Sequence, residues 1–427
     1  MIRKTDLPQP IVAINIGSSG IRAIAADYDE RHETFHILGS EYSTYRHPCI
    51  EKGVVQNSSD IGFMVNETWK KLCNRVGRGE LKNIFVCVGG QSLQSVHVEA
   101  HRQQRRSEIR QKMLSEMIQE CSLKIERSAA EAGVLSVLPE RWDVDGESYD
   151  NLPVDVVGKD ITLYATAFVM RKAYSTKIDD MMRRTGLTIY DRELVPDACI
   201  TALTVDEERE KGCAVIDMGA QTTTLTVYKN NQFYLTKVKP LGGYDVTHDI
   251  ETIGITPQDA EKLKCKFGTL SLKPDLVDRS IANIPSAREG EEPVSTTYGN
   301  LCSIIAWRIN ETVIPLLEEI KRVEDIRIIY LTGGASMLRG IVPFLSKKTN
   351  IPVKYATHAQ YLAHDTEDEY YKPLYGTLVG TLLLGQEYMS THPDDKPGKE
   401  DWLGKIKETM GMLFGGEEMA ESNNKRI

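Results

Sequence analysis

Residues 213–228 read CAVIDMGAQTTTLTVY and are the stretch that decides the fold. An apolar run leads into Asp217, a tight turn contains Gly219, and a second run alternates up to Tyr228. This pattern predicts a β-hairpin whose turn presents backbone N–H groups and hydroxyls to an anion. Asp217, at the end of the first strand, could hold a hydrated Mg²⁺ through water. An ordinary glycine hairpin is the alternative, because short motifs produce false positives.

A second copy of the pattern lies near the start of the chain. Residues 12–25 read VAINIGSSGIRAIA and align with residues 214–227 without gaps. In this alignment Asn15 falls on Asp217, and Gly17 falls on Gly219. Two similar hairpins half a chain apart predict a duplicated architecture with a ligand between the halves.

A third stretch, IIYLTGGASMLRG, occupies residues 328–340. It predicts a buried strand that runs into Gly333 and Gly334. Paired glycines let a backbone approach a ligand closely at low steric cost.

Composition is that of an ordinary globular protein. The chain has 427 residues, so several domains are expected, and its net charge of −9 argues against a nucleic-acid binder. Its 8 cysteines form no CxxC pair and have no nearby histidine at zinc-site spacing, so we expect reduced thiols. Residues 1–9 are polar, which predicts no signal peptide, and no apolar run approaches the ~18 residues of a membrane span. We therefore expect a cytoplasmic protein.

The two hairpins and the later strand–TGG–turn resemble the actin/Hsp70/sugar-kinase ATPase superfamily. Within it, the chain is similar to the FtsA family of bacterial cell-division proteins, which are actin homologues. The resemblance covers residues 11–385 and the tail. It includes, in order, the motifs GGYDVTHDI (242–250), AEKLKCKFG (260–268), LTGGASMLRGI (331–341) and KPLYGTLVGTLLLG (372–385).

This resemblance implies an α/β fold: the duplicated actin/Hsp70-like ATPase fold with two large subdomains, each with a smaller one, and a C-terminal amphipathic helix. The expected boundaries are 8–88 and 170–200 for the first large subdomain (1A), 89–169 for an inserted small subdomain (1C), 201–244 and 303–386 for the second large subdomain (2A), 245–302 for its small subdomain (2B), 387–398 for a linker, 399–416 for the amphipathic helix and 417–427 for a polar tail.

The resemblance also implies ATP and Mg²⁺ as ligands, with Asp217 holding the metal through water. The expected phosphate-binding residues are Asn15, Gly17, Ser18, Ser19, Asp217, Gly219, Gln221, Thr222 and Thr223. The expected nucleoside-binding residues are Gly242, Gly243, Glu261, Lys264, Gly333, Gly334 and Ala335. No catalytic residue is assigned.

One residue departs from the superfamily pattern. The superfamily has an Asp in the first hairpin where this chain has Asn15. An amide can still accept hydrogen bonds from metal-bound water, but it lacks the negative charge. Hydrolysis needs a metal and a positioned water together. We therefore expect ATP to act as a conformational or assembly ligand, with slow turnover at most.

The C-terminal stretch KEDWLGKIKETMGMLFGG follows a polar, proline-containing segment. Its apolar side chains fall on one helical face. They are Trp402, Leu403, Ile406, Met410, Leu413 and Phe414, and Lys405 and Lys407 flank them. The pattern predicts a helix that lies in the interface of an anionic membrane. The alternative is a helix packed against the body of the protein. The FtsA family carries a membrane-targeting helix at this place.

Partners are implied by the resemblance alone. Family members form filaments with themselves and bind the C-terminal tail of the tubulin-like protein FtsZ through the second small subdomain. Arg308 lies where we expect contacts to that tail, although it could be an ordinary surface arginine. Residues 89–169 are expected to dock other division proteins. The implied location is the cytoplasmic face of the inner membrane at the division septum, as a peripheral protein.

The resemblance therefore favours a membrane-tethered, ATP-binding filament protein that anchors FtsZ. Two alternatives are a soluble actin-like adaptor of pilus assembly or another membrane machine, and a small-molecule kinase of the same superfamily. The predicted membrane helix and Asn15 argue against the kinase. An Hsp70-type chaperone is disfavoured because no substrate-binding domain follows the ATPase core.

Three local expectations complete the prediction. The basic run at 101–110, with Arg102, Arg105 and Arg106, is expected to be a solvated loop. Residues 58–60 supply cap candidates for a helix that ends near residue 76. Residues 374–385 predict a packed core helix.

Overall fold

The computed structural model describes residues 9–150 and 152–392. These residues form two compact units. The main unit contains residues 9–91 and 177–392, and the small unit contains residues 92–150 and 152–176. Each unit is described by itself below.

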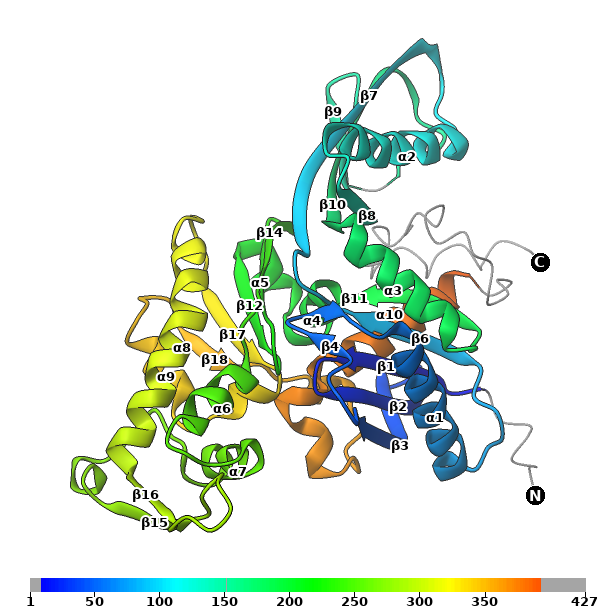
Figure 1. Cartoon of the computed structure of the whole chain (residues 1–427). Helices are drawn as coiled ribbons and strands as arrows, with labels where there is room; N and C mark the ends of the chain where they lie inside the picture. Colours follow the sequence, from blue (N-terminus) through cyan, green and yellow to red (C-terminus); the bar gives the residue numbers. More distant parts are fainter. Residues whose placement is uncertain (1–8, 151, 393–427) are drawn as a thin grey trace. The chain divides into compact units, whose positions relative to one another are not determined.

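The first sheet of the main unit contains the first hairpin (Figure 1). Its strand order is β11-β6-β1-β2-β3. The strands are β1 (Ile11–Gly17), β2 (Gly20–Asp29), β3 (Thr34–Thr44), β6 (Asn83–Val88) and β11 (Ile189–Leu194). The hairpin strands β1 and β2 are antiparallel, as are β2 and β3, whereas β6 and β11 continue the sheet in parallel from β1.

A second set of strands repeats this topology around the second hairpin. Its order is β18-β17-β12-β13-β14. The strands are β12 (Cys213–Met218), β13 (Thr223–Lys229), β14 (Gln232–Lys239), β17 (Ile328–Thr332) and β18 (Val353–Tyr355). Here too a hairpin and a third antiparallel strand lie on one side, and two parallel strands lie on the other. The duplication predicted from the two hairpins is therefore present in the topology.

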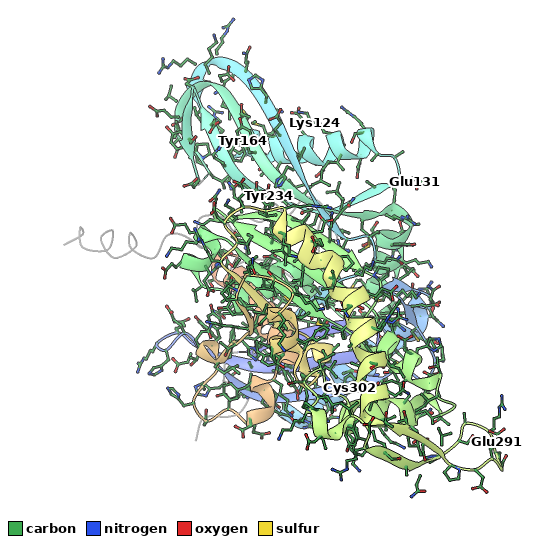
Figure 2. The ribbon with its side chains drawn as sticks, turned by 90° about the vertical axis from the view of Figure 1, so that its left-hand side faces the viewer. Lys124, Glu131, Tyr164, Tyr234, Glu291 and Cys302 are labelled. Carbon is green, nitrogen blue, oxygen red and sulfur yellow. The ribbon has the colours of Figure 1, made fainter. Side chains whose placement is uncertain are left out.

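Helices and small hairpins complete the main unit. The helices are α1 (Ser58–Val76), α3 (Lys172–Arg184, beginning in the small unit), α4 (Val195–Leu203), α5 (Asp206–Lys211), α6 (Gly243–Glu251), α7 (Pro257–Phe267), α8 (Tyr298–Lys321), α9 (Ile341–Ser346) and α10 (Gly376–Thr391). The hairpins pair β4 (Ile50–Glu51) with β5 (Val54–Val55), and β15 (Ser280–Ile284) with β16 (Val294–Thr297). Figure 2 shows Glu291 at the tip of the loop that joins β15 to β16.

Two helices connect the duplicated halves. Helix α4 contacts β6 and β11 of the first sheet and β12 and β13 of the second. Helix α10 packs tightly on α4, since a Cβ at Gly380 would overlap the carbonyl of Ala198. Helix α10 is apolar on most sides and buries Leu378, Val379 and Leu382 completely, which confirms the expected core helix.

The small unit is an antiparallel sheet covered by one helix. Its strand order is β7-β10-β8-β9. The elements are β7 (Gln94–Glu108), α2 (Gln111–Ser128), β8 (Ala132–Val144), β9 (Glu147–Tyr149) and β10 (Val157–Arg171). Leu114, Met117 and Cys121 of α2 are buried in one core with Trp142 and Leu163 of the sheet. Figure 2 labels Lys124 on α2 and Tyr164 on β10.

Three local expectations need correction. The basic run at 101–110 is mostly strand, not loop, because β7 pairs with β10 over most of its length. The α1 cap is Asn57, whose side chain accepts from the backbone of Asp60, so the cap lies one residue before the expected candidates. Helix α10 continues to Thr391, past residue 387 where we expected the linker to begin. An edge-to-face contact of Tyr388 with Phe85 and its stacking on His392 favour this extension.

Candidate functional site

A cavity of about 620 Å³ lies in the main unit between the two hairpins. Both duplicated halves contribute to its walls, as expected for a ligand site between repeated subdomains. Polar groups from the hairpin turns face it together with apolar side chains such as Ile178, Met181 and Leu338.

The structure brings together most of the predicted phosphate-binding residues. The cavity lining includes Asn15, Gly17, Ser18, Ser19, Asp217, Gly219 and Thr222. Two predicted residues are not in this lining. Thr223 is fully buried and its hydroxyl donates to the carbonyl of Leu241 at 2.9 Å, so it supports the turn from behind. Gln221 instead accepts a 2.8 Å hydrogen bond at Oε1 from the backbone N–H of Lys52.

The predicted nucleoside-binding residues form another part of the lining. They are Gly243, Glu261, Lys264, Gly333, Gly334 and Ala335. Gly242 is the exception, since it packs against the turn of the second hairpin, where a Cβ would lie 2.6 Å from the carbonyl oxygen of Gly219. Gly242 therefore allows close packing of two loops and does not itself line the cavity.

An ion pair anchors this part of the cavity. The ammonium group of Lys264 donates to the carbonyl of Gly243 at 2.8 Å and pairs with a carboxylate oxygen of Glu261 at 2.7 Å. Burial raises the pKa of Glu261, but hydrogen bonds from Lys264 and Thr247 outweigh burial and hold it below its ordinary value. The carboxyl group of Glu261 is therefore charged at neutral pH. The pair joins α7 to the start of α6 and leaves polar atoms facing the cavity.

Asp217 is the acidic group at the turn of the second hairpin and lines the cavity. Burial raises its pKa to about 6. Gly333 approaches it so closely that a Cβ at Gly333 would overlap Oδ1, and Gly333 adopts φ of +83°, which favours glycine. A cation near this carboxylate would offset the cost of its burial, so the site chemistry fits a hydrated Mg²⁺.

Arg22 is a cavity residue that the sequence analysis missed. It lies on β2 opposite Asn15, and its guanidinium sits over the ring of Tyr42 at 4.4 Å, with Tyr375 at 5.5 Å. The available signal was one arginine between Ile21 and Ala23, in the first part of a strand that is otherwise apolar up to Ala26. A guanidinium held by aromatic rings beside a turn of N–H groups suits an anionic ligand.

Together these features describe a site for a phosphorylated ligand. Residues of both hairpin turns line it, Arg22 and Lys264 supply positive charge, and Asp217 supplies a carboxylate. A Cβ at Gly334 would meet nothing within 4 Å, so the lining leaves space in front of this residue.

Solved structures of similar fold are actin-like ATPases. The PilM-PilN type IV pilus biogenesis complex matches with a TM-score of 0.60 and 15% identity, covering 88% of this chain and 98% of that one. MreB 5 of Spiroplasma citri bound to AMPPNP matches with a TM-score of 0.54 and 11% identity, covering 91% and 99%. The duplicated topology and the cavity between its hairpins define the chain as a protein of the actin-like ATPase fold.

Sequence comparisons identify more specific relatives among proteins of this fold. The family described as "Cell division protein FtsA" matches residues 214–380. Cell division protein FtsA of Pseudomonas aeruginosa is 24% identical over 89% of this chain and 90% of its own length. The FtsA proteins of Enterococcus hirae and Escherichia coli are 29% and 26% identical, but these matches span only 51% and 62% of those relatives. Over most of its length the chain is therefore similar in sequence to FtsA cell-division proteins.

Proposed function

We propose that the chain binds ATP in the cavity between its hairpins, polymerises on the cytoplasmic membrane, and anchors FtsZ filaments to that membrane at the division site. The observation that carries the proposal is the convergence of both hairpin turns on one cavity, in a chain of the FtsA type. The MreB 5 structure of Spiroplasma citri has AMPPNP bound, which suggests a nucleotide as the ligand of this cavity.

Residues of both hairpins would hold the triphosphate. Backbone N–H groups near Gly17 and Gly219 and the hydroxyls of Ser18 and Ser19 donate to phosphate oxygens, and Arg22 adds a charged fork. Mg²⁺, when bound, neutralises phosphate charge, and Asp217 accepts hydrogen bonds from its water shell. Gly334, Ala335 and the Glu261–Lys264 pair surround the nucleoside.

Turnover is proposed to be slow or absent. Asn15 occupies the position in β1 that Asp217 occupies in β12, so only one of the two equivalent strands supplies a carboxylate. Hydrolysis requires metal and attacking water to be held in line. In this proposal ATP acts through closure of the two halves and through assembly.

Helix α8 would take part in binding the FtsZ tail. Arg308 donates from Nε and Nη2 to the two carboxylate oxygens of Asp249, at 2.6 and 2.7 Å, and also pairs with Glu311. Its neighbour Trp307 exposes 75% of its surface. An exposed tryptophan beside an oriented arginine is typical of the residues that dominate binding interfaces. We therefore place the tail on this face of α8, with Trp307 as a main contact.

The membrane contact is assigned to residues 399–416, which lie outside the described residues. Among residues 9–150 and 152–392, no helix is both long and apolar enough to cross a bilayer. The proposed contact is therefore interfacial, with Trp402, Leu403, Ile406, Met410, Leu413 and Phe414 in the lipid and Lys405 and Lys407 at anionic headgroups. Filament formation would strengthen it through avidity.

Subdomain roles follow the expected boundaries. We propose 1A at 8–88 and 170–200, 1C at 89–169, 2A at 201–244 and 303–386, and 2B at 245–302. The small unit, residues 92–176, largely coincides with the proposed 1C and is the proposed docking site for other division proteins.

A soluble adaptor of a pilus-type machine is the second candidate. Its support is the likeness to the PilM-PilN complex, which covers 98% of that chain. Such an adaptor would have the same fold and cavity but no need for a lipid-binding helix. Membrane binding by the tail therefore distinguishes the two candidates.

Co-sedimentation with vesicles tests the proposal. The full chain and a truncation ending at Pro397 are mixed with ATP, Mg²⁺ and anionic vesicles. We expect only the full chain to pellet, and Trp402→Glu to reproduce the loss, because a charge at the apolar face opposes insertion. Lys399→Ala, which keeps the apolar face, is the matched control. If the full chain stays soluble, the pilus-type adaptor becomes the better account.

A further inference from the structure

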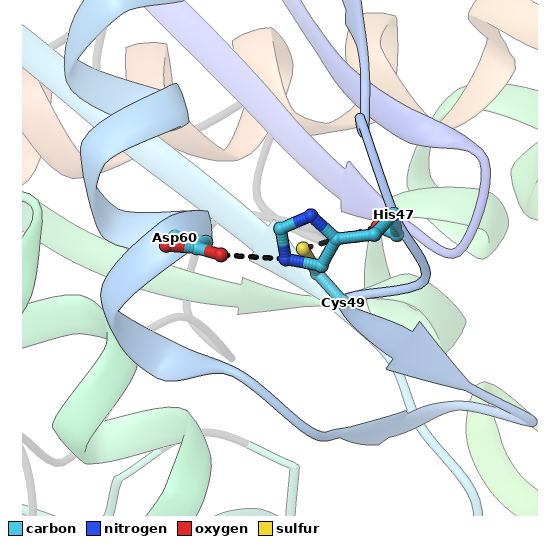
Figure 3. A group of neighbouring side chains, drawn as sticks. All are labelled: His47, Cys49 and Asp60. Carbon is cyan, nitrogen blue, oxygen red and sulfur yellow. Dashed lines mark hydrogen bonds and ion pairs between the residues drawn. The ribbon is translucent and has the colours of Figure 1, made fainter.

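The side chains of His47, Cys49 and Asp60 converge in the main unit (Figure 3). None of the three residues belongs to the cavity lining described above. Their ligand atoms all lie within 4.8 Å of one another. Nε2 of His47 is 2.6 Å from Oδ2 of Asp60. Imidazole, thiol and carboxylate together form a mixed donor set that transition metals bind.

Local backbone structure brings the three residues together. His47 and Cys49 lie in the loop that enters β4, and Asp60 lies in the first turn of α1. The carbonyl of Cys49 accepts backbone hydrogen bonds from Gln56 and Asn57, at 2.8 and 3.3 Å. These bonds close the loop, so the start of α1 returns to the position of Cys49.

Asp60 is oriented by a neighbour that is not itself part of the donor set. Asn57 caps α1 by accepting from the backbone N–H of Asp60, and its Nδ2 donates to Oδ2 of Asp60 at 2.8 Å. Hydrogen bonds of this kind fix the direction of a metal-binding carboxylate. The carboxylate therefore faces His47 by construction of the helix cap.

We propose that His47, Cys49 and Asp60 bind a divalent zinc-type ion, with water in the fourth position. Ligand atoms of a tetrahedral zinc site lie about 3.3–3.8 Å apart, given bonds of about 2.0–2.3 Å. The His47–Asp60 contact must open by about an ångström to reach this spacing. Both side chains are solvent-exposed to a large degree, at 57% and 42%, so they can move and an ion can enter.

The donor chemistry selects the metal. A thiolate and an imidazole favour Zn²⁺ or Co²⁺, whereas Mg²⁺ and Ca²⁺ prefer oxygen ligands. The Cys49 thiol loses its proton to solvent as the metal–sulfur bond forms.

Such an ion would stabilise one wall of the cavity. Ile50, Gly53 and Val55 belong to or border the β4–β5 hairpin that follows Cys49, and all three line the cavity. A metal would tie the start of this hairpin to α1. This inference stands independently of the proposed function, because it rests only on the three side chains.

Titration of the full-length, metal-free chain with Co²⁺ tests the proposal. We expect one ion per chain and a near-ultraviolet absorption band from the thiolate–cobalt bond, which Zn²⁺ then abolishes. Cys49→Ser should remove the band, and His47→Gln and Asp60→Asn should each weaken binding at least about tenfold. Cys265→Ser, which alters an exposed thiol of α7, is the matched control and should leave the band unchanged.

Two results would overturn the inference. The first is the absence of saturable Co²⁺ binding to the folded chain. The second is a band that survives Cys49→Ser, since that band would come from another thiol. If Cys49→Ser fails to fold, His47→Gln decides, because His47 is largely exposed and its replacement leaves the core intact. Unchanged Co²⁺ affinity in His47→Gln would then contradict the metal site and leave His47 and Asp60 as a hydrogen-bonded pair.

Discussion

Lys52 and Gln221 connect the two duplicated halves at the edge of the cavity. The backbone N–H of Lys52, in the β4–β5 turn, donates to Oε1 of Gln221, in the turn of the second hairpin, at 2.8 Å. Gln221 therefore does not have to contact phosphate to matter for the ligand. It links the β4–β5 turn to the turn of the second hairpin.

Gln221→Ala tests this role. A typical intramolecular hydrogen bond contributes about 0.5–1.5 kcal/mol, so loss of this one should weaken ATP binding about two- to tenfold. Lys52→Ala is the control, because it changes the side chain and keeps the donating N–H. Equal loss in both variants, measured by equilibrium titration, would show that the hydrogen bond is not the cause.

Asp217 should make the stability of the ligand-free protein depend on pH. Its pKa is raised to about 6, so between about pH 4 and pH 6 the folded chain binds more protons than the unfolded chain. Stability contributed by the neutral carboxyl is therefore lost as the pH rises through this window. Asp217→Asn should not lose stability in this window, because an asparagine side chain does not ionise.

Thermal melts of both proteins from pH 4.5 to 8 check the sign. The Tm of Asp217→Asn minus that of the wild type should increase from pH 5 to pH 7 and then stay level. A difference that is constant with pH would mean that the carboxyl titrates normally.

Gly333 and Gly334 should respond differently to substitution. Gly333 combines φ of +83° with close approach to Asp217, whereas a Cβ at Gly334 meets nothing within 4 Å. We expect Gly333→Ala to cost more than about 2 kcal/mol, because backbone strain and steric overlap add. Gly334→Ala should change stability by less than about 0.5 kcal/mol. Chemical denaturation of the two variants measures both values, and similar losses would contradict the geometry.

Arg308 should matter for an acidic or polar peptide of the FtsZ-tail type. Arg308→Ala removes both the guanidinium and its two hydrogen bonds to Asp249. We expect peptide affinity to fall at least about tenfold, in the range of an interface hot spot. Arg322→Ala, an exposed arginine just after the end of α8, should leave affinity unchanged. Fluorescence anisotropy with a labelled peptide measures both, and unchanged binding by Arg308→Ala would make Arg308 a structural residue.

Much of the fold was predictable because two short patterns repeat. The hairpins at 12–25 and 214–227 alternate cleanly and contain turn glycines, and their duplication predicts the two-sheet topology. The strand before Gly333 was equally predictable, because β17 is a short apolar run followed by glycines.

Features that depend on tertiary pairing were not predictable. Residues 101–108 form a strand despite their charge because β10 pairs with them, and local composition carries no sign of that partner. The convergence of His47, Cys49 and Asp60 needs a closed loop and a helix cap, so ligand spacing along the sequence missed it. Arg22 was missed because its role depends on Tyr42 and Tyr375, which come from distant parts of the chain.

Binding of ATP by the full chain tests the central claim most directly. A fluorescent ATP analogue with Mg²⁺ should bind saturably at one site per chain and be displaced by ATP. Gly334→Leu should keep the fold but weaken binding at least about tenfold, because the new side chain occupies the open space beside the nucleoside. Absence of saturable binding to the folded wild type, or equal affinity in Gly334→Leu, would contradict the account.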